Sequence, residues 1–244
     1  MAIDAVIFDW GGTLTPWAKI DYSDEWRSVA SVVAPDDVDQ ATAALLDAAQ
    51  RVWARSRDEH RSATFEEICA ISGHPATPEA VEAYRAFWEP ATVTDPDAQA
   101  LFEGLHSAGV KVGVLSNTVW PRAWHEAIFE RDGVHGLIDG DVYTSEIAWT
   151  KPHERAFTAA MSAVGADDPG KCVFVGDRLF DDVWGASAAG MRTIHVPHSA
   201  IPPDQIGHSI GEPDAVVQRL SEVAGVVEGW HDVRRPTRAG PYNP

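Results

Sequence analysis

Short apolar, β-rich runs alternate along this chain with longer stretches in which apolar residues recur at helical spacing. The short runs predict buried strands at residues 6–8, 110–116, 171–175 and 192–196, with a further short strand at 142–144. Strands that alternate with helices are typical of a parallel sheet covered by helices on both faces. The pattern therefore predicts an α/β fold.

The stretch between the first two strands is helical throughout. Apolar spacing predicts helices over residues 24–34 and 38–57. Capping signals predict two more helices, because Thr64 begins a capping box and Thr77 stands directly before a proline at a first helical position. We find no convincing strand from residue 19 to about 88, so this all-helical insert is a candidate second domain.

Beyond the insert, helices fill the spaces between the remaining strands. They are predicted to begin at Asp95 and run past residue 106, and to cover 121–131, 153–164, 182–190 and 212–227. The last residues, 231–244, are polar and rich in proline, which predicts a loose tail.

Composition narrows the class of protein. With 45% apolar residues and ten tryptophans in 244 residues, the chain can bury a core, and disorder is not expected. A net charge of −18 argues against nucleic acid and anionic membrane surfaces as partners. No apolar run is long enough to span a membrane, and both Cys69 and Cys172 are expected to be reduced. We therefore expect a cytoplasmic protein, a monomer or homodimer, that acts on a small molecule.

Polar groups suited to binding anions and metals stand where the predicted strands end. Asp9 follows the first strand and precedes two glycines, whose backbone N–H groups can approach a ligand closely. Ser116 ends the second strand, and Asp177 follows the third. In open α/β folds, ligands bind at this carboxyl edge of the sheet. The loop that carries Lys151 adds a cation.

Four segments of the chain resemble, in order, the motifs of the haloacid dehalogenase-like (HAD) hydrolase superfamily: FDWGGTL, VLSNT, KP at 151–152 and GDRLFDDVWGASAAGM. The resemblance implies a Rossmann-like, three-layer α/β/α core over residues 1–16 and 93–228. It also implies the subgroup with a helical cap domain inserted between motifs one and two, here residues 17–92. Residues 229–244 form the polar tail.

The resemblance also implies a role for each motif residue. Asp9 is similar to the family nucleophile, a carboxylate that forms a covalent intermediate, so a phosphorylated small molecule is the expected substrate. Catalysis is assigned to Asp9, Ser116 and Lys151. Substrate binding is assigned to Gly11, Gly12, Thr13 and Asn117. Mg²⁺, which prefers oxygen ligands, is assigned to Asp9, Gly11 through its carbonyl, Asp177 and Asp182.

The second acid of the fourth motif depends on the alignment of the residues around it. Asp181 and Asp182 both stand at spacings that the family accepts. The small residues that follow, including Gly185 and Gly190, align best when Asp182 is the functional acid, with Asp181 as the alternative.

The sequence departs from the family at Gly11. Most phosphatases of the superfamily carry there a second aspartate that protonates the leaving group, and such acid–base help is worth about 10²–10⁴-fold in rate. A phosphatase without it would need substrates with good leaving groups, or a proton from a cap histidine such as His60 or His74.

Three other functions stay open. A 2-haloacid dehalogenase also lacks the second acid, but enzymes of that type carry serine and asparagine near Asp177, where this chain has Gly176-Asp177-Arg178. The segment from Asp9 to Thr13 resembles the Asp-Trp-Ala-Gly-Thr first motif of phosphonoacetaldehyde hydrolases. Those enzymes need a lysine in the cap, and the only cap lysine here is Lys19. The third is a protein that binds phosphate but does not catalyse a reaction.

The tryptophans admit two interpretations. Trp10, Trp17, Trp120 and Trp124 lie near motif loops, either as a wall over an aromatic substrate or, in the favoured interpretation, as core packing. Those of the insert, Trp26, Trp53 and Trp88, are expected to pack its interior.

Overall fold

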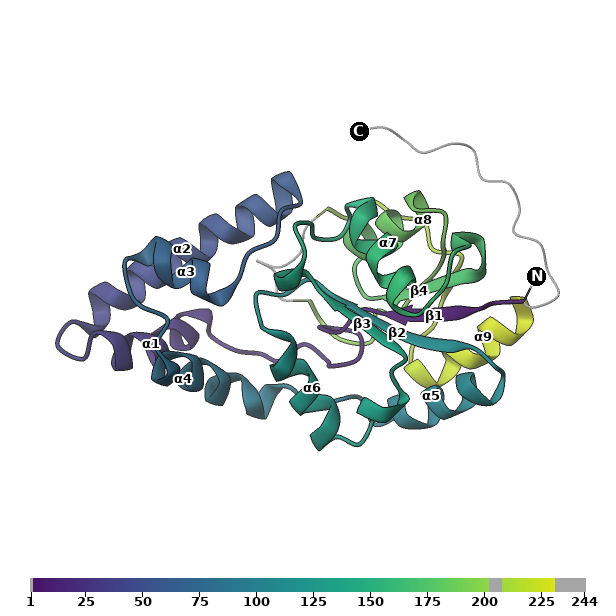
Figure 1. Cartoon of the computed structure of the whole chain (residues 1–244), viewed down its shortest axis with the longest axis horizontal. Helices are drawn as coiled ribbons and strands as arrows, with labels where there is room; N and C mark the ends of the chain where they lie inside the picture. Colours follow the sequence, from purple (N-terminus) through teal and green to yellow (C-terminus); the bar gives the residue numbers. More distant parts are fainter. Residues whose placement is uncertain (1, 202–207, 231–244) are drawn as a thin grey trace.

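A single parallel sheet organises the protein (Figure 1). The computed structural model describes residues 2–201 and 208–230. The strand order is β3-β2-β1-β4-β5-β6, and every neighbouring pair is parallel. The strands are β1 (Ala5–Phe8), β2 (Lys111–Ser116), β3 (Gly140–Tyr143), β4 (Cys172–Gly176), β5 (Arg192–His195) and β6 (Ala215–Val216).

The central strand β1 lies between β2 and β4, so the chain order reverses at this point of the sheet. Phe8, the last residue of β1, pairs with Val114 on one side and Val175 on the other. The carboxyl ends of these three strands therefore share one edge. Such reversal points are where open α/β sheets bind ligands.

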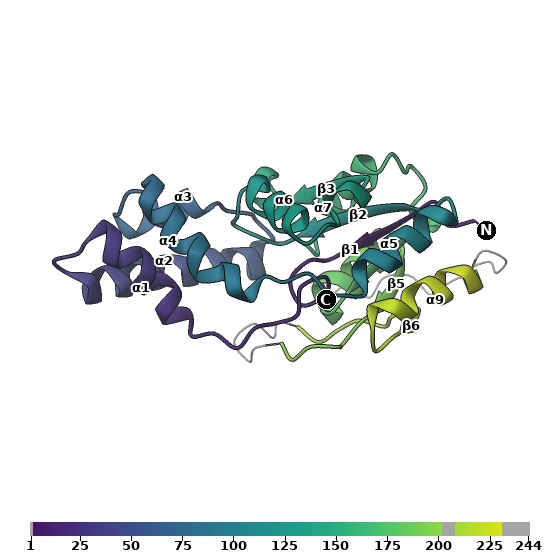
Figure 2. The same cartoon turned by 90° about the horizontal axis from the view of Figure 1, so that it is seen from below.

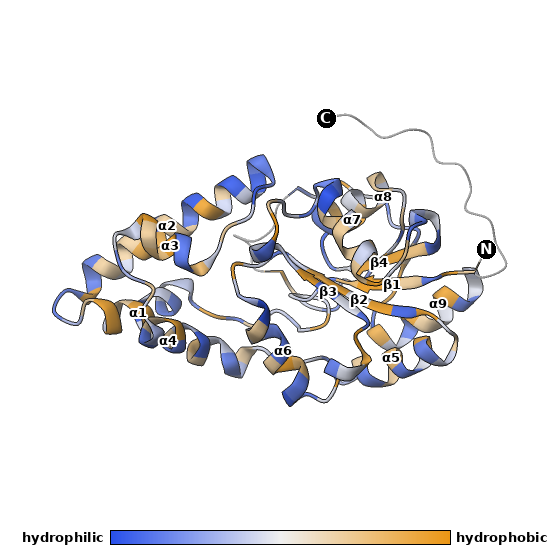
Figure 3. Cartoon of the chain, viewed as in Figure 1, coloured by the Kyte–Doolittle hydropathy of each residue, from blue (hydrophilic) through white to orange (hydrophobic). Residues whose placement is uncertain are grey.

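Helices cover both faces of the sheet, as the sequence predicts (Figure 2). They are α5 (Ala98–Ser107), α6 (Arg122–Arg131), α7 (Glu154–Ala163), α8 (Gly185–Ala188) and α9 (Val223–Trp230). Side chains alternate across β1, with Val6 and Phe8 in the core cluster that holds α5 and α9, and Ile7 in the cluster that holds α7. Because β1 is buried on both faces, it appears in the sequence as a continuous apolar run (Figure 3).

Four helices lie at one end of the molecule (Figure 1). They are α1 (Tyr22–Val33), α2 (Val38–Glu59), α3 (Phe65–Ser72) and α4 (Pro78–Trp88). α1 packs against α2 and α4, and α2 packs against α3. Thr64 and Thr77 each accept a hydrogen bond from a backbone N–H of the first helical turn, as their capping signals predict. The division of the chain into a core, a cap and a tail at the predicted boundaries stays a prediction.

The two connections to this group of helices meet at the sheet. The backbone N–H of Asp95 donates to the carbonyl of Leu14 at 2.7 Å. His198 links the same region, with its Nε2 2.9 Å from the carbonyl oxygen of Gly12 and its Nδ1 3.6 Å from Asp95. The chain thus leaves and re-enters the sheet at nearly one point.

Two local predictions are wrong, and a third is confirmed only in part. The helix predicted over 212–227 is instead the short edge strand β6, a 3₁₀ turn and α9, which begins only at Val223. The helix predicted over 182–190 is present, but it begins earlier, as a π-helical turn over Leu179–Trp184 that continues into α8. Asp95 does not cap α5, because its carboxylate accepts from the N–H of Asp97 in a turn before the helix.

No helix among the described residues combines the length and apolar character needed to cross a membrane. Cys69 and Cys172 are buried and not joined in a disulfide. Most of the predicted tail, residues 231–244, lies outside the described residues.

Candidate active site

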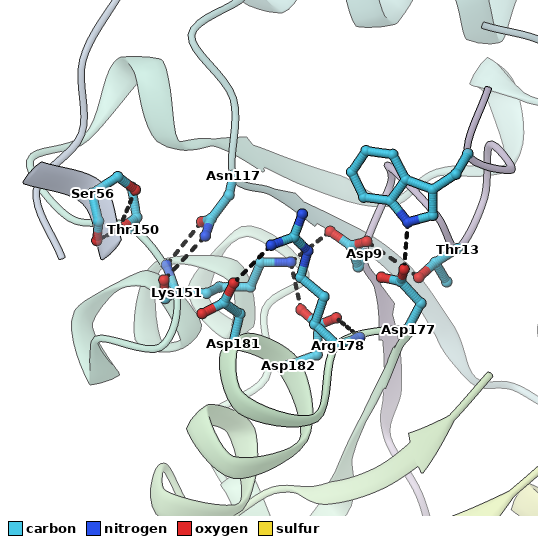
Figure 4. Close-up of polar contacts among 11 residues, drawn as sticks. Asp9, Thr13, Ser56, Asn117, Thr150, Lys151, Asp177, Arg178, Asp181 and Asp182 are labelled. Carbon is cyan, nitrogen blue, oxygen red and sulfur yellow. Dashed lines mark hydrogen bonds and ion pairs between the residues drawn. The ribbon is translucent and has the colours of Figure 1, made fainter. Parts of the chain in front are cut away.

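The carboxyl ends of β1 and β4 bring two aspartates together (Figure 4). Asp9 follows β1 and Asp177 follows β4, and the register places the last residues of both strands side by side. Asp182, from the π-helical turn, completes a cluster in which one carboxylate oxygen of each residue lies within 4.8 Å of the others. All three side chains are buried.

A buried lysine holds this cluster together. The Nζ of Lys151 lies 2.5 Å from Asp9 Oδ1 and 2.7 Å from Asp182 Oδ1. The side chain of Asn117 fixes the backbone of the same lysine, accepting from its N–H at 2.8 Å and donating to its carbonyl at 3.0 Å. Thr13 Oγ1 donates to the other oxygen of Asp9 at 3.2 Å. Asp9 is therefore oriented from two sides.

The buried cluster contains three carboxylates and only one cation, Lys151, so positive charge is lacking. Burial raises the pKa of Asp9 to about 6, although Lys151 opposes the shift. Burial and the neighbouring charges of Asp9 and Asp182 raise the pKa of Asp177 well above its usual range. Burial lowers the pKa of Lys151, but Asp182 and Asp9 outweigh it, so this pKa lies above its ordinary value.

The cluster fits a divalent cation. Asp177 Oδ1 is buried and has no hydrogen-bond partner among the described residues. Its other oxygen accepts from the indole N–H of Trp17 at 2.6 Å. A buried carboxylate oxygen without a partner is costly, and a hard cation bound between Asp9 and Asp177 would satisfy it.

Gly12 has a structural reason to be glycine. Its φ is +92°, and an added Cβ would overlap Asp177 and the Trp17 indole. Gly11, by contrast, has open space where a Cβ would stand. Both glycines line the cavity described below.

The structure distinguishes the two candidate acids of the fourth motif. Asp182 lies in the cluster and accepts from the backbone N–H of Arg178 at 2.9 Å. Asp181 lies outside the cluster and pairs with the Arg178 guanidinium at 3.5 Å. The position of Asp182 agrees with the alignment that the sequence favours.

A cavity of about 260 Å³ extends from the cluster into the helices α1, α2 and α4. At the sheet edge its lining includes the predicted residues Asp9, Gly11, Gly12, Ser116, Asn117 and Lys151. Thr13, Asp177 and Asp182 are not among the lining residues. Ser116 is 1% exposed.

Several residues considered for catalysis do not reach this cavity. His60, His74 and Lys19 are absent from its lining among the described residues. The structure thus gives no support to a proton donated by either histidine or to a Schiff base on Lys19.

Core packing, the favoured interpretation, is confirmed for Trp10, Trp120 and Trp124, which are buried in the core cluster. Trp10, Trp17 and Trp120 also line the cavity. Trp53 and Trp88 also line it, and Trp53 is 38% exposed rather than packed inside. Of the insert tryptophans, Trp26 is buried as predicted.

Two site residues escape sequence reasoning. Arg178 stacks over Trp17, with its guanidinium carbon 5.2 Å from the ring centroid, and lines the cavity. Glu25, at the start of α1, lines the cavity as a buried acid. Its sequence signal, an acid in a first helical turn, is the same as that of any exposed acid there.

Comparison with known proteins gives relatives that match most of the chain. It is 27% identical over 233 residues to the glyceraldehyde 3-phosphate phosphatase of Methanopyrus kandleri, covering 92% of this chain and 97% of the relative. An HAD phosphatase from Thermococcus onnurineus has a similar structure, with a TM-score of 0.66 at 20% identity over 93% of this chain and 99% of that one. The L-2-haloacid dehalogenase of Xanthobacter autotrophicus, with chloropropionic acid covalently bound, gives 0.63 at 20% identity and the same coverage. Likeness to the two structures shows the fold alone.

A family model settles the family. The model for haloacid dehalogenase-like hydrolases matches residues 3–190, which contain all four motifs and the acidic cluster. The chain belongs to the haloacid dehalogenase-like hydrolase family and is a hydrolase.

Proposed function

We propose that this hydrolase is a Mg²⁺-dependent phosphatase of a small phosphorylated metabolite, acting through an aspartyl-phosphate on Asp9. The observation that carries the proposal is the convergence of three buried carboxylates and Lys151 at the sheet edge. Relatives named as phosphatases support the same reaction class. Their substrates are not transferred to this chain.

The residues divide the work of hydrolysis between them. An oxygen of Asp9 attacks phosphorus, the bond to the leaving oxygen breaks, and the leaving oxygen takes up a proton from water. Water then cleaves the aspartyl-phosphate, which regenerates Asp9 and releases inorganic phosphate. Ser116, the N–H of Asn117 and Lys151 bind phosphoryl oxygens and stabilise the charge that develops on them.

Asp9, the carbonyl of Gly11, Asp177 and Asp182 are the residues that would hold Mg²⁺. When bound, the ion neutralises the repulsion between the attacking carboxylate and the phosphoryl group. Asp182 also orients Lys151, to which it lies 2.7 Å distant.

Dehalogenation is the alternative that shares the fold. A reaction without a metal would leave Asp177 as an additional buried charge beside the nucleophile Asp9. The partnerless oxygen of Asp177 favours the metal-dependent reaction instead.

The test is hydrolysis of p-nitrophenyl phosphate with Mg²⁺ and with EDTA. We expect turnover only with Mg²⁺, and Asp9→Asn should lower it by at least about a thousandfold. Asp24→Asn, which removes an exposed acid from α1, is the control and should leave turnover unchanged. Chloride release from 2-chloropropionate in EDTA would instead support the dehalogenase. A stable beryllofluoride adduct on Asp9 without turnover of any ester would support a binding protein.

A further inference from the structure

The part of the cavity that the inserted helices line holds another polar group, Glu25. There Glu25 is 3% exposed and lines the cavity, surrounded by rings. Tyr84 Oη accepts from the Trp120 indole at 3.3 Å, and the Trp88 and Trp120 ring centroids are 5.6 Å apart. Tyr22 adds a fourth ring, 6.4 Å from Trp88. We call these four rings and Glu25 the aromatic cage.

No ion pair among the described residues includes the Glu25 carboxylate. The cationic lining residues have acidic partners elsewhere: Lys151 pairs with Asp182, Arg178 with Asp181 and Arg57 with Asp58. The Trp88 N–H lies close enough to lower the pKa of Glu25 but forms no hydrogen bond of normal geometry. Burying a carboxylate without a counter-charge is unfavourable, so the site is suited to a cation that arrives with the ligand.

Glu25 and Asp9 line the same cavity, so a substrate whose phosphate lies at Asp9 can extend to Glu25. Glu25 lies beside Tyr84, which is bonded to Trp120, and the Trp120 ring is 5.3 Å from that of Trp10, the residue after Asp9. These rings form a wall of the cavity that leads from Asp9 to Glu25.

Resting on the proposed phosphatase function, we propose that the substrate is an aminoalkyl phosphate, whose ammonium group binds in the aromatic cage against Glu25. Faces of tryptophan and tyrosine attract ammonium groups, and a carboxylate adds charge pairing. A cavity of about 260 Å³ suits a phosphate ester with a short spacer. The ammonium group also offsets the repulsion that a phosphate meets on a chain of net charge −18.

The experiment compares esters that differ in charge but not in shape. Phosphocholine and 3,3-dimethylbutyl phosphate differ only in a nitrogen replaced by carbon, and phosphoethanolamine adds the primary amine. We expect kcat/KM for phosphocholine or phosphoethanolamine to exceed that for 3,3-dimethylbutyl phosphate, whose alkyl end is uncharged (the neutral ester), by at least about tenfold. This comparison needs no variant, so it holds even where a substitution impairs folding.

Glu25→Gln should reduce this preference to near unity, mainly through KM, while Asp24→Asn in the same helical turn should keep it. Equal or faster hydrolysis of the neutral ester by the wild type overturns the proposal, and so does a preference that survives in a folded Glu25→Gln protein.

Binding of choline alone, measured by calorimetry on the Mg²⁺-treated chain, separates the two proposals. Choline binding that Glu25→Gln abolishes, without turnover of any ester, supports the aromatic cage and overturns the phosphatase. Hydrolysis of p-nitrophenyl phosphate without choline binding and without ammonium preference supports the phosphatase and overturns the aromatic cage.

Discussion

At the scale of single residues, Gly11 is the departure from the family that matters most for chemistry. Its backbone is not in the left-handed region, and a Cβ added there would meet no atom within 4 Å. Packing therefore does not forbid a side chain at this position. The absent acid is a difference in chemistry that a single substitution can reverse.

Gly11→Asp should restore a proton donor for the leaving group. We expect hydrolysis of alkyl phosphates, whose leaving groups are poor, to rise by at least about tenfold, because acid help matters most there. Hydrolysis of p-nitrophenyl phosphate, with its good leaving group, should change little. The measurement is the slope of log kcat against leaving-group pKa, which should flatten.

Gly11→Asn is the matched control, since it has the same shape without the acid. A slope that is equally steep in both variants would show that proton donation does not limit this enzyme.

Glu25 should make stability depend on pH. Burial raises its pKa from 4.5 to about 7, against the opposing effect of Tyr84 and Trp88. The folded state thus binds this proton more tightly, so the stabilisation is complete below the unfolded pKa and is lost as pH rises through about 7. Between pH 4.5 and 8, Glu25→Gln should gain on the order of 3 kcal/mol relative to the wild type.

Urea unfolding at both ends of this range measures the difference. Asp24→Asn, exposed in the same turn, should follow the wild type. If the difference in unfolding free energy between Glu25→Gln and the wild type does not change with pH, the raised pKa of Glu25 is contradicted.

At the scale of elements, the caps of the inserted helices test how local signals act. Thr77 accepts from the N–H of Ala80 at 3.2 Å and starts α4, the helix that carries Tyr84 and Trp88. Thr77→Ala should lower the free energy of unfolding by about 1 kcal/mol. Ser162→Ala, at an exposed position within α7, should have almost no effect. Thermal unfolding of both variants checks this, and equal midpoints would contradict the role of the cap.

Elements were predictable where local pattern and tertiary packing agree. The strands β1, β2 and β4 lie inside the sheet, so burial on both faces leaves a mainly apolar run that the sequence displays. The edge strand β6 has only two residues and half-exposed surroundings, so its sequence carries no such run. The π-helical turn Leu179–Trp184 has only six residues, which is too short for its wider period to be told from that of an ordinary helix in the sequence.

The same contrast holds for the site. Asp9, Ser116 and Asp177 were predictable because each follows a strand, and parallel strands bring their ends to one edge. Glu25 and Tyr22 come from α1, Tyr84 and Trp88 from α4, and Trp120 from the loop after β2. Only tertiary packing turns the acid of α1 into a buried one. Motif spacing finds the first kind of residue and not the second.

At the scale of the whole molecule, metal binding should be linked to folding. Only the folded chain brings Asp9, Asp177 and Asp182 within reach of one ion. Mg²⁺ at a hundredfold excess over its Kd should stabilise the fold by about 2.7 kcal/mol. Differential scanning calorimetry with and without Mg²⁺ measures the shift in unfolding temperature.

Asp177→Asn should abolish this shift, whereas Asp181→Asn, outside the cluster, should keep it. An unfolding temperature of the wild type that ignores millimolar Mg²⁺ is incompatible with the proposed metal site.

The hydrogen bond between Asp95 and Leu14 has a consequence for how such an enzyme diversifies. Because the two ends of the helical insert are adjacent, we expect that a different insert could replace it with little strain on the sheet. Replacing these helices would leave Asp9, Asp177 and Asp182 in place and change the cavity lining that α1, α2 and α4 contribute. Under the proposed function, a new substrate would then need no change in the residues that carry out hydrolysis.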